Sequence, residues 1–402
     1  MEKIAIIGGG AAGYFLAANL GKELGSRTVI FEQAQMPLQK VRISGGGRCN
    51  VTHACFDPLD LVEFYPRGKK ELLSVFYQFQ PGDTMAWFDE RGVALKIEDD
   101  NRIFPVSNSS MSIIECLVHE VGKNKVKVNF SDGVKSIHKT ENGFELETNS
   151  GVHRFDKVVV TTGSTPKFWK NIKTLGHTIV SPVPSLFTFN CKDPRIEGLM
   201  GISFDQAEIK IKSKKLESEG PLLITHWGFS GPAILRLSAW GALALNESNY
   251  KFSIEINFVQ QSKEDVIDLL NQKKMNDSKK SVHKYNPFDF PKRFWISILQ
   301  YCKVGEHLVF ADLSKKQIEQ IATELTAASY QIDGKSTFKD EFVTAGGVDL
   351  KEINFQTMES KVVPNLFFAG EVLNIDAITG GFNFQACWSE AYIISNKLKD
   401  IY

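Results

Sequence analysis

IAIIGGGAAG, residues 4–13, sets the architecture of this chain. Its first four residues form a short apolar, β-branched run, and its glycines at 8, 10 and 13 follow the spacing G-x-G-x-x-G. Residues 14–24 then carry apolar side chains at helical spacing, and residues 28–32 form a second strand-like run. A strand, a helix and a strand joined by short connections predict a parallel, doubly wound α/β sheet.

The glycine spacing gives this turn a chemical meaning. Gly8 permits a tight turn, Gly10 lets the backbone approach a pyrophosphate, and Gly13 allows the helix to pack closely on the strand. The phosphates would meet unpaired amides at the helix N-terminus. Glu32 ends the second strand and is placed to accept hydrogen bonds from a ribose. These features predict a dinucleotide site, for which NAD and FAD are both candidates.

Two distant glycine-rich segments favour FAD. The first, residues 44–50 (SGGGRCN), exposes successive backbone amides beside the charge of Arg48. The second follows the strand-like residues 366–370, where Gly380 and Gly381 precede a helical stretch that runs to about Lys397. That stretch offers a second helix N-terminus to a ligand. An NAD domain needs no such element, whereas FAD is long and its flavin end is supported elsewhere in the sequence.

At these segments the chain resembles the bacterial NAD(P)/FAD-dependent oxidoreductases of the YhiN/BaiN, aminoacetone-oxidase-like type, within the wider glutathione-reductase-like flavoprotein class. The resemblance covers essentially the whole chain. Besides residues 8–13, Glu32, residues 44–50 and residues 370–385, it rests on residues 102–105 (RIFP), 225–232 (THWGFSGP), 344–348 (TAGGV) and 357–361 (TMESK). The sequence departs from the family pattern at Leu38-Gln39, His53 and Asn374, where Gly-Arg, Asn and Asp are usual.

The resemblance implies an α/β fold: a glutathione-reductase-like Rossmann FAD-binding domain with an inserted β, barrel-like region and a helical region. Residues 1–189 and 341–402 would form the discontinuous FAD-binding domain. Residues 190–340 would form a substrate or cap domain, mainly β over about 190–260 and helical over about 262–330.

The resemblance also implies the cofactor contacts. Glu32 would bind the adenosine ribose, Val134 would meet the adenine through its backbone, Glu371 would reach the ribityl or phosphate portion, and residues 381–383 the flavin ring. The complete expected set is Gly8, Gly10, Ala11, Ala12, Gly13, Glu32, Gln33, Lys40, Ser44, Gly45, Gly46, Gly47, Arg48, Cys49, Asn50, Val134, Thr162, Gly163, Gly370, Glu371, Asp376, Gly380, Gly381, Phe382 and Asn383.

Local patterns predict the remaining elements. After Gln33 an irregular, Gly-rich stretch runs to about Pro66, and residues 126–162 form a β-meander with turns at Asn142-Gly143 and Ser150-Gly151. Ser314 and Gln317 form a capping box, which marks a helix start. The expected helices are 71–79, 84–91, 107–121, 263–273, 292–301 and 315–327, and further strands are expected at 209–215 and 252–258.

Composition excludes several classes of protein. Lys+Arg and Asp+Glu both total 47 in 402 residues, so no basic excess suggests a nucleic-acid or membrane-surface protein. The six cysteines form no C-x-x-C pair, which argues against a disulfide framework or zinc site. No signal peptide or spanning segment is expected, and no metal site. We therefore expect a cytoplasmic protein.

No acid or base is compelled by the sequence, because flavin chemistry is largely the cofactor's. His226 is the candidate proton donor, against the alternative of a buried histidine satisfied by backbone. Cys49 beside Arg48 could be an activated thiol, but it has no partner cysteine and is interpreted as a packing residue.

The function expected from the sequence is that of an FAD-dependent oxidoreductase acting on a small-molecule substrate. NAD(P)H or an organic substrate would reduce the flavin and a small acceptor would reoxidise it, in C=C reduction or amine oxidation. The alternative is a flavin-binding module in RNA modification or regulation, suggested by the Lys-rich residues 273–292. The sequence does not indicate the oligomeric state.

Overall fold

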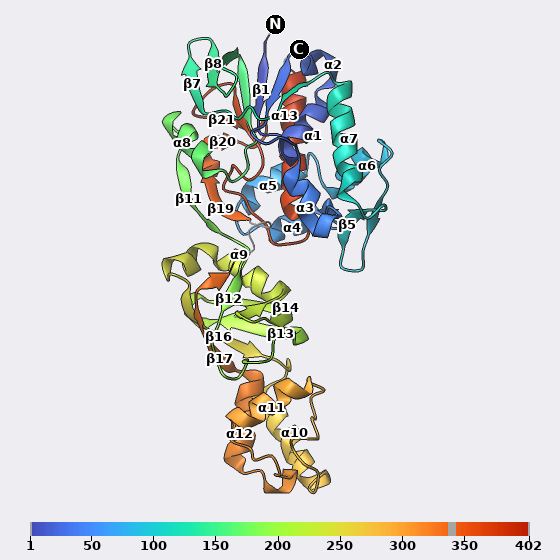
Figure 1. Cartoon of the computed structure of the whole chain (residues 1–402), viewed down its shortest axis with the longest axis vertical. Helices are drawn as coiled ribbons and strands as arrows, with labels where there is room; N and C mark the ends of the chain where they lie inside the picture. The colour runs from blue at the N-terminus through green and yellow to red at the C-terminus, as the bar shows by residue number, and fades with distance from the viewer. Residues whose placement is uncertain (1, 337–342, 401–402) are drawn as a thin grey trace. The chain divides into compact units, whose positions relative to one another are not determined.

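The computed structural model describes residues 2–336 and 343–400, and the chain divides into two units (Figure 1). The first comprises Met1–Pro184 and Lys339–Tyr402, and the second Ser185–Phe338. The first boundary between the two parts was expected after residue 189; in the structure it follows Pro184. The expected second boundary, after residue 340, lies outside the described residues. The roles assigned to the two parts stay predictions.

A seven-stranded sheet forms the centre of the first unit, in the order β20-β21-β22-β10-β1-β2-β6. Its five parallel strands are β22 (Leu366–Phe368), β10 (Lys157–Val160), β1 (Ile4–Ile7), β2 (Thr28–Phe31) and β6 (Lys127–Asn129). β21 (Glu359–Ser360) and β20 (Ile353–Asn354) extend it in antiparallel pairing. All four residues of β1 are buried, because both faces of a parallel sheet are covered. This is the doubly wound arrangement that the opening residues predict.

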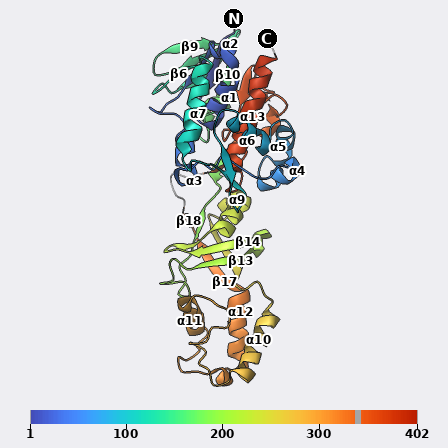
Figure 2. The ribbon, with the colours of Figure 1, turned by 90° about the vertical axis from the view of Figure 1, so that its right-hand side faces the viewer.

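The two ends of the chain pack together in this unit. Helix α1 (Ala11–Asn19) lies against α13 (Phe382–Lys399) and α7 (Ser110–Lys123), as Figure 2 shows. The Phe15 ring of α1 lies 5.1 Å from the Trp388 ring of α13, centroid to centroid. The indole N–H of Trp388 also donates to the Val51 carbonyl, 2.9 Å away. The C-terminal helix is therefore held beside the first glycine-rich turn.

Shorter elements complete the first unit. The meander expected over residues 126–162 is confirmed only in its middle, as β7 (Ser136–Thr140), β8 (Gly143–Glu147) and β9 (Val152–Phe155), with its turns at the two predicted glycines. Its first and last runs are β6 and β10, which pair in parallel with β2 and β1 in the central sheet instead. A second small sheet pairs β3 (Thr52–His53), β5 (Arg102–Pro105) and β4 (Leu95–Ile97), and β11 (Ile179–Pro184) pairs with β19 (Thr344–Val348). The other helices are α2 (Gly21–Gly25), α3 (Gln39–Gly47), α4 (Pro58–Leu61), α5 (Lys69–Phe76), α6 (Pro81–Asp89) and α8 (Pro166–Thr174).

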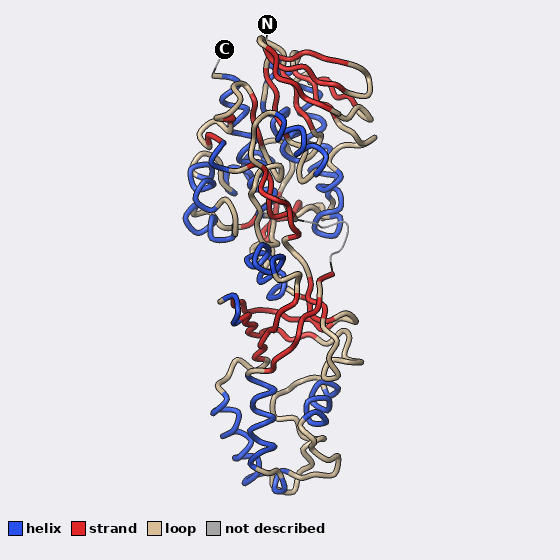
Figure 3. The backbone as a smooth tube through the Cα atoms, turned by 90° about the vertical axis from the view of Figure 1, so that its left-hand side faces the viewer, coloured by secondary structure: helices blue, strands red, loops and turns tan. Residues whose placement is uncertain are grey.

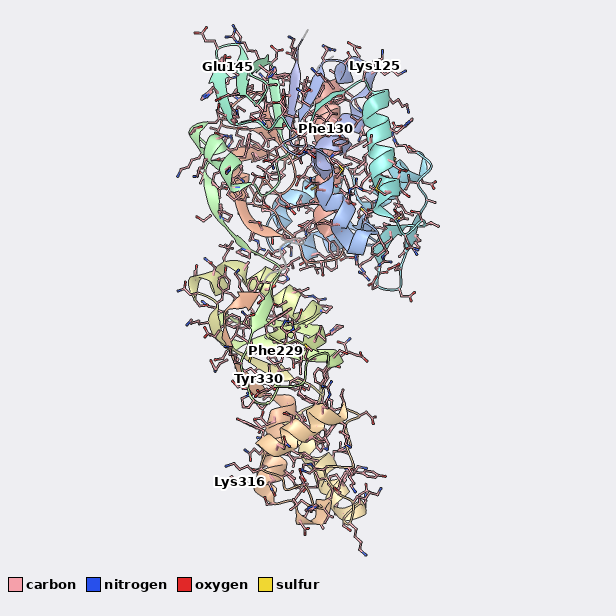
Figure 4. The ribbon with its side chains drawn as sticks, viewed as in Figure 1. Lys125, Phe130, Glu145, Phe229, Lys316 and Tyr330 are labelled. Carbon is pink, nitrogen blue, oxygen red and sulfur yellow. The ribbon has the colours of Figure 1, made fainter. Side chains whose placement is uncertain are left out.

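The second unit is built on an antiparallel sheet in the order β17-β16-β13-β14-β15-β12-β18. Its strands are β12 (Thr188–Asn190), β13 (Ser203–Ile211), β14 (Leu216–Ile224), β15 (Gly228–Ser230), β16 (Lys251–Asn257), β17 (Ala328–Asp333) and β18 (Lys335–Ser336). The first and last strands of this order are separated only by Gly334, so the sheet curls back on itself. The predicted barrel-like region has this form. Phe229 of β15 and Tyr330 of β17 pack inside it, with ring centroids 4.9 Å apart (Figure 4).

Four helices accompany this sheet. α9 (Pro232–Glu247) packs on β14. α10 (Lys263–Asn276), α11 (Lys292–Tyr301) and α12 (Lys315–Thr326) form a helical part that shares its hydrophobic core with the sheet; Figure 3 draws all helices in blue. The predicted capping box of Ser314 and Gln317 is confirmed, and Ser262 with Asp265 forms a second one. α10, α11 and α12 begin at the residues the sequence predicts, since capping residues fix a helix start locally.

Arg195 ties the helical part of this unit to its sheet. Its guanidinium donates to Asp193, to Glu324 of α12 at 2.6 Å and to the carbonyl of Ser329 at 2.5 Å. It also lies 4.0 Å from the centre of the Tyr330 ring, a cation–π contact. Arg195 is only 5% exposed, so these are buried charges that need one another.

None of the described helices combines the length and apolar composition needed to cross a lipid bilayer.

Candidate cofactor site

Of the three glycines in the G-x-G-x-x-G pattern, the fold requires two, and the third leaves open space beside it. A Cβ atom on Gly8, whose φ is +112°, would lie 2.5 Å from the carbonyl oxygen of Thr161, and one on Gly13 would overlap the carbonyl oxygen of Gly8. A Cβ on Gly10 would meet no described heavy atom within 4 Å. Gly10 precedes α1 as its N-cap. No described side chain caps the first turn of α1, which leaves its amides available to a pyrophosphate.

Glu32 lies beside this turn with acceptor capacity to spare. One carboxylate oxygen accepts from the Gly9 amide at 2.6 Å and the other from the Ala34 amide at 2.7 Å. A carboxylate has about four acceptor positions, so ribose hydroxyls could still donate to it. The neighbouring Gln33 is exposed, and a Cβ on Gly133 would lie 2.8 Å from its Cβ. The structure thus brings Glu32 and Gln33 close to the residue before Val134.

The SGGG segment breaks helix α3 and opens its backbone. Ser44 leaves the helical conformation, and Gly45, Gly46 and Gly47 follow with φ of +57°, +68° and +84°. This left-handed run suits glycine because a side chain would be strained there. A Cβ on Gly45 would meet the Phe104 ring at 2.8 Å, whereas Gly46 and Gly47 have no described atom within that 4 Å range. The expected ligand-facing loop therefore has free space beside its last two glycines.

Arg48 and Cys49 have other partners in the protein. The Arg48 guanidinium donates to Glu98 at 2.7 Å and lies 3.9 Å above the Phe104 ring, so its charge is engaged. Cys49 is buried, and burial raises the pKa of its thiol to about 12. This supports the interpretation as a packing residue, because a protonated thiol is a poor nucleophile.

Asn50 connects this loop to the far end of the sequence. Its side-chain oxygen is buried and has no hydrogen-bond partner in the described part of the chain. A Cβ on Gly381 would lie 2.8 Å from that oxygen. Buried polar atoms are nearly always satisfied, so this oxygen indicates a missing donor. The two glycine-rich segments meet at this point.

The N-terminus of α13 forms this second wall. Gly381, with φ of +95°, is its N-cap, and no described side chain caps it. Nδ1 of His53 lies 3.1 Å from the carbonyl oxygen of Gly380, and Phe382 stacks on Phe64 with centroids 4.4 Å apart. The Asn383 side chain bonds both the amide and the carbonyl of Ala377, so it holds the loop before the helix.

Five further predicted residues gather beside α1. Lys40 and Glu371 form an ion pair at 2.5 Å, and a Cβ on Gly163 would lie 3.9 Å from the same Glu371 oxygen. Burial alone would lower the pKa of Lys40, but Glu371 outweighs it and holds that pKa above its ordinary value. A Cβ on Gly370 would lie 3.6 Å from Cβ of Ala12. Thr162 precedes Gly163, two residues after the end of β10. Segments from both ends and the middle of the chain thus share one cradle.

Two residues expected at the site, Asp376 and His226, do not contribute to this cradle. Asp376 is fully buried, and both its oxygens accept from Arg67. Its carboxylate therefore orders the loop rather than presenting a free charge. His226 belongs to the second unit and is exposed, with its ring 4.1 Å from that of Trp227. The buried alternative for His226 is wrong, and its role as a proton donor stays a prediction.

The TMESK segment contains a hydrogen-bonded set that sequence reasoning missed. His177 links Glu352, at 2.9 Å, to Ser360, at 3.0 Å, in the order of a catalytic triad. The Ser360 oxygen also accepts from the amides of Val362 and Val363, which occupies its lone pairs. A serine without a free lone pair cannot attack a substrate. The set is structural, and it joins β21 to the residues before β11.

The cradle fits FAD on its own features. Open space at Gly10, Gly46 and Gly47 and two uncapped helix N-termini suit an anionic ligand, and Glu32 and Asn50 have hydrogen-bonding capacity left for a sugar and a polar ring.

A model of the HI0933-like protein Rossmann domain matches residues 2–397. The chain belongs to this family. Membership confirms the predicted resemblance, the Rossmann-type fold and the predicted class, an FAD-dependent oxidoreductase. The individual contact residues stay predictions.

Curated relatives of this HI0933-like protein align along nearly their whole length. It is 28% identical to a protein of Escherichia coli K12 named ribosomal RNA dihydrouridine synthase, over 98% of this chain and 97% of that one. It is 25% identical to the 3-dehydro-bile acid delta(4,6)-reductase of Clostridium scindens, over 98% of each.

Solved structures with a similar fold are more distant in sequence. An open flavocytochrome c3 fumarate reductase superposes with a TM-score of 0.51 at 13% identity, covering 99% of this chain and 78% of that one. The 3-ketosteroid-delta4-(5alpha)-dehydrogenase of Rhodococcus jostii RHA1 gives 0.50 at 10% identity, covering 98% and 96%. At these identities the likeness concerns the fold alone.

Proposed function

We propose that this HI0933-like protein is an FAD-dependent reductase of carbon–carbon double bonds conjugated to a carbonyl group, with NAD(P)H as reductant. The observation that carries the proposal is the shared chemistry in the names of two full-length relatives. A dihydrouridine is a uridine whose ring double bond has gained two hydrogens, and a delta(4,6)-reductase acts on double bonds of a dehydro compound. Both names indicate that a double bond gains two hydrogens, which a flavin can supply as a hydride with a proton.

The residues of the cradle would hold the cofactor as follows. Glu32 would bind the ribose, and the amides at the start of α1 and at Gly46 and Gly47 would bind the phosphates. The N-terminus of α13 would place its positive end beside the flavin, where it favours negative charge. When bound, flavin accepts two electrons as a hydride and passes them to an acceptor. The net reaction would add one hydride from NAD(P)H and one proton from solvent across the double bond, and would yield NAD(P)⁺ and the saturated product.

Anaerobic stopped-flow kinetics test this proposal. We expect NADH or NADPH to bleach the flavin absorbance near about 450 nm, and a conjugated enone to restore it with one saturated product per NAD(P)H consumed. An unconjugated alkene of the same carbon skeleton is the matched control and should leave the flavin reduced. Bleaching by neither nucleotide would contradict the choice of reductant. Reoxidation by dioxygen but by no enone would contradict the reaction.

A second candidate is reduction of uracil within RNA, favoured by the relatives named for ribosomal RNA. The stretch first suggested for RNA, residues 273–292, supports it poorly because Lys273 and Lys280 both pair with Asp277. Helix α8 supports it better. Lys167, Lys170 and Lys173 lie on its exposed face, the helix has no acidic residue, and none of the three forms an ion pair with a described residue.

Replacement of the three α8 lysines by glutamine should weaken RNA binding by about tenfold at 0.1 M salt and lower the salt slope by up to about 3. Filter binding of ribosomal RNA fragments at several salt concentrations measures both. The control is Lys273→Gln with Lys280→Gln, because both lysines already pair with Asp277; it should bind much more like the wild type than the triple α8 variant does. Absence of salt-sensitive binding by the wild type would remove this candidate.

A further inference from the structure

A buried carboxyl group lies under the turn that carries Glu371. Glu390, on α13, is 0% exposed. One of its oxygens accepts from the Gly370 amide at 2.6 Å. Its other oxygen is buried and has no hydrogen-bond partner among residues 2–336 and 343–400. Neither the composition nor the glycine motifs point to this residue, which sequence reasoning missed. The available signal was an acidic residue three positions after Cys387 on the buried face of the last helix.

The surroundings of Glu390 favour its neutral form. No described cation forms an ion pair with it, and burial disfavours an unpaired carboxylate. The titratable groups that face it are Tyr65 and Cys387, and burial raises the pKa of both well above their usual values. Burial raises the pKa of Glu390 to about 8, against the smaller, opposite effect of the Gly370 amide. At neutral pH this carboxyl group is mainly protonated, and its neighbours add no positive charge.

Its position links it to the cofactor cradle. Gly370 has three neighbours: Glu390, which accepts from its amide, Cys387, and Ala12 of α1. A Cβ on Gly370 would lie 3.2 Å from the Cys387 sulfur. The next residue, Glu371, already has its charge offset by Lys40. A pyrophosphate at the start of α1 is anionic, so a second, unpaired carboxylate here would repel it. A neutral Glu390 can hold the turn without that repulsion.

We propose that Glu390 is a positioning residue for FAD: in its protonated form it holds the Gly370–Glu371 turn while keeping the cradle free of a second negative charge. FAD binding and retention of the Glu390 proton are then coupled, each favouring the other. The inference rests on FAD occupying this cradle and adds a residue that none of the expected contacts includes.

The test is FAD affinity against pH in the full chain stripped of flavin. Between pH 6.5 and 9.5 we expect the wild-type affinity to fall by about tenfold for each unit by which FAD raises the pKa of Glu390. Glu390→Gln keeps an acceptor for the Gly370 amide and cannot ionise. It should match the wild type at pH 6.5 within about threefold and lose the decline at high pH. Glu390→Leu, which has no acceptor, should bind weakly at every pH.

Calorimetry in two buffers of different ionisation enthalpy gives a readout that needs no variant. Near pH 8 the wild type should take up protons as FAD binds. A flat wild-type pH profile, zero proton uptake, or a Glu390→Gln variant with the wild-type decline would each overturn the proposal. Failure to bind FAD at any pH would overturn the cofactor assignment as well, so the two failures are distinguishable.

Discussion

Gly10→Val is expected to abolish FAD binding while leaving the protein folded. A Cβ on Gly10 would meet no heavy atom of the described chain within 4 Å, and φ at this residue is −88°, which valine adopts without strain. The branched side chain would fill the space through which a pyrophosphate reaches the α1 amides. Loss of two charge-assisted hydrogen bonds costs about 3–6 kcal/mol, so affinity should fall at least about 100-fold. The flavin-to-protein ratio of the purified variant measures this.

Two other glycines make the result interpretable. Gly122 in α7 is also open around its Cβ position and lies outside the cradle, so Gly122→Val should retain flavin. Gly13→Ala should lose flavin and stability together, because its Cβ would overlap the Gly8 carbonyl oxygen. Normal flavin content in Gly10→Val would contradict the site. A melting temperature as low as that of Gly13→Ala would mean that Gly10 serves the fold instead.

The sequence predicts well those parts of the fold that local chemistry determines. β1 reads as a continuous apolar run because both sheet faces are covered, and α10, α11 and α12 begin where the sequence predicts because Ser262, Pro291 and Ser314 fix their first turns. Gly8 and Gly13 are recognisable for the same reason, since each is needed by contacts within one strand–helix unit and its neighbouring strand. The first glycine-rich turn of the cradle was therefore predictable from the sequence.

Features that depend on distant partners were not predictable. The stretch expected to be irregular up to Pro66 contains α3, whose break at Ser44 is visible only in its backbone angles. The strand expected over residues 209–215 is confirmed only for residues 209–211, the end of β13. Beyond Ile211 the chain reverses through Lys212–Lys214 to pair β13 with β14. Arg48 binds Glu98, fifty positions away, and Asp376 binds Arg67 across most of the chain. From the sequence alone, a charged residue in such a segment is interpreted as a ligand contact, because its partner within the protein is not visible.

Arg195→Met should destabilise the second unit by about 3–5 kcal/mol, because it leaves Glu324 and Asp193 partly buried without their cation. Urea unfolding followed by tryptophan fluorescence measures the free energy of unfolding. Lys251→Met is the control: Lys251 pairs with Asp333 on the surface, with both side chains more than 70% exposed, and its loss should cost at most about 1 kcal/mol.

The loss of stability in Arg195→Met should arise mainly because the carboxylates of Glu324 and Asp193 are left without a cation. The loss of favourable bonds to Arg195 should contribute less. If so, adding Glu324→Gln to Arg195→Met removes one of the unpaired charges and should make the double variant about 1–3 kcal/mol more stable than Arg195→Met alone. A double variant less stable than Arg195→Met would contradict this reasoning. In that case the hydrogen bonds of Glu324, and not its buried charge, would be what the sheet and α12 depend on.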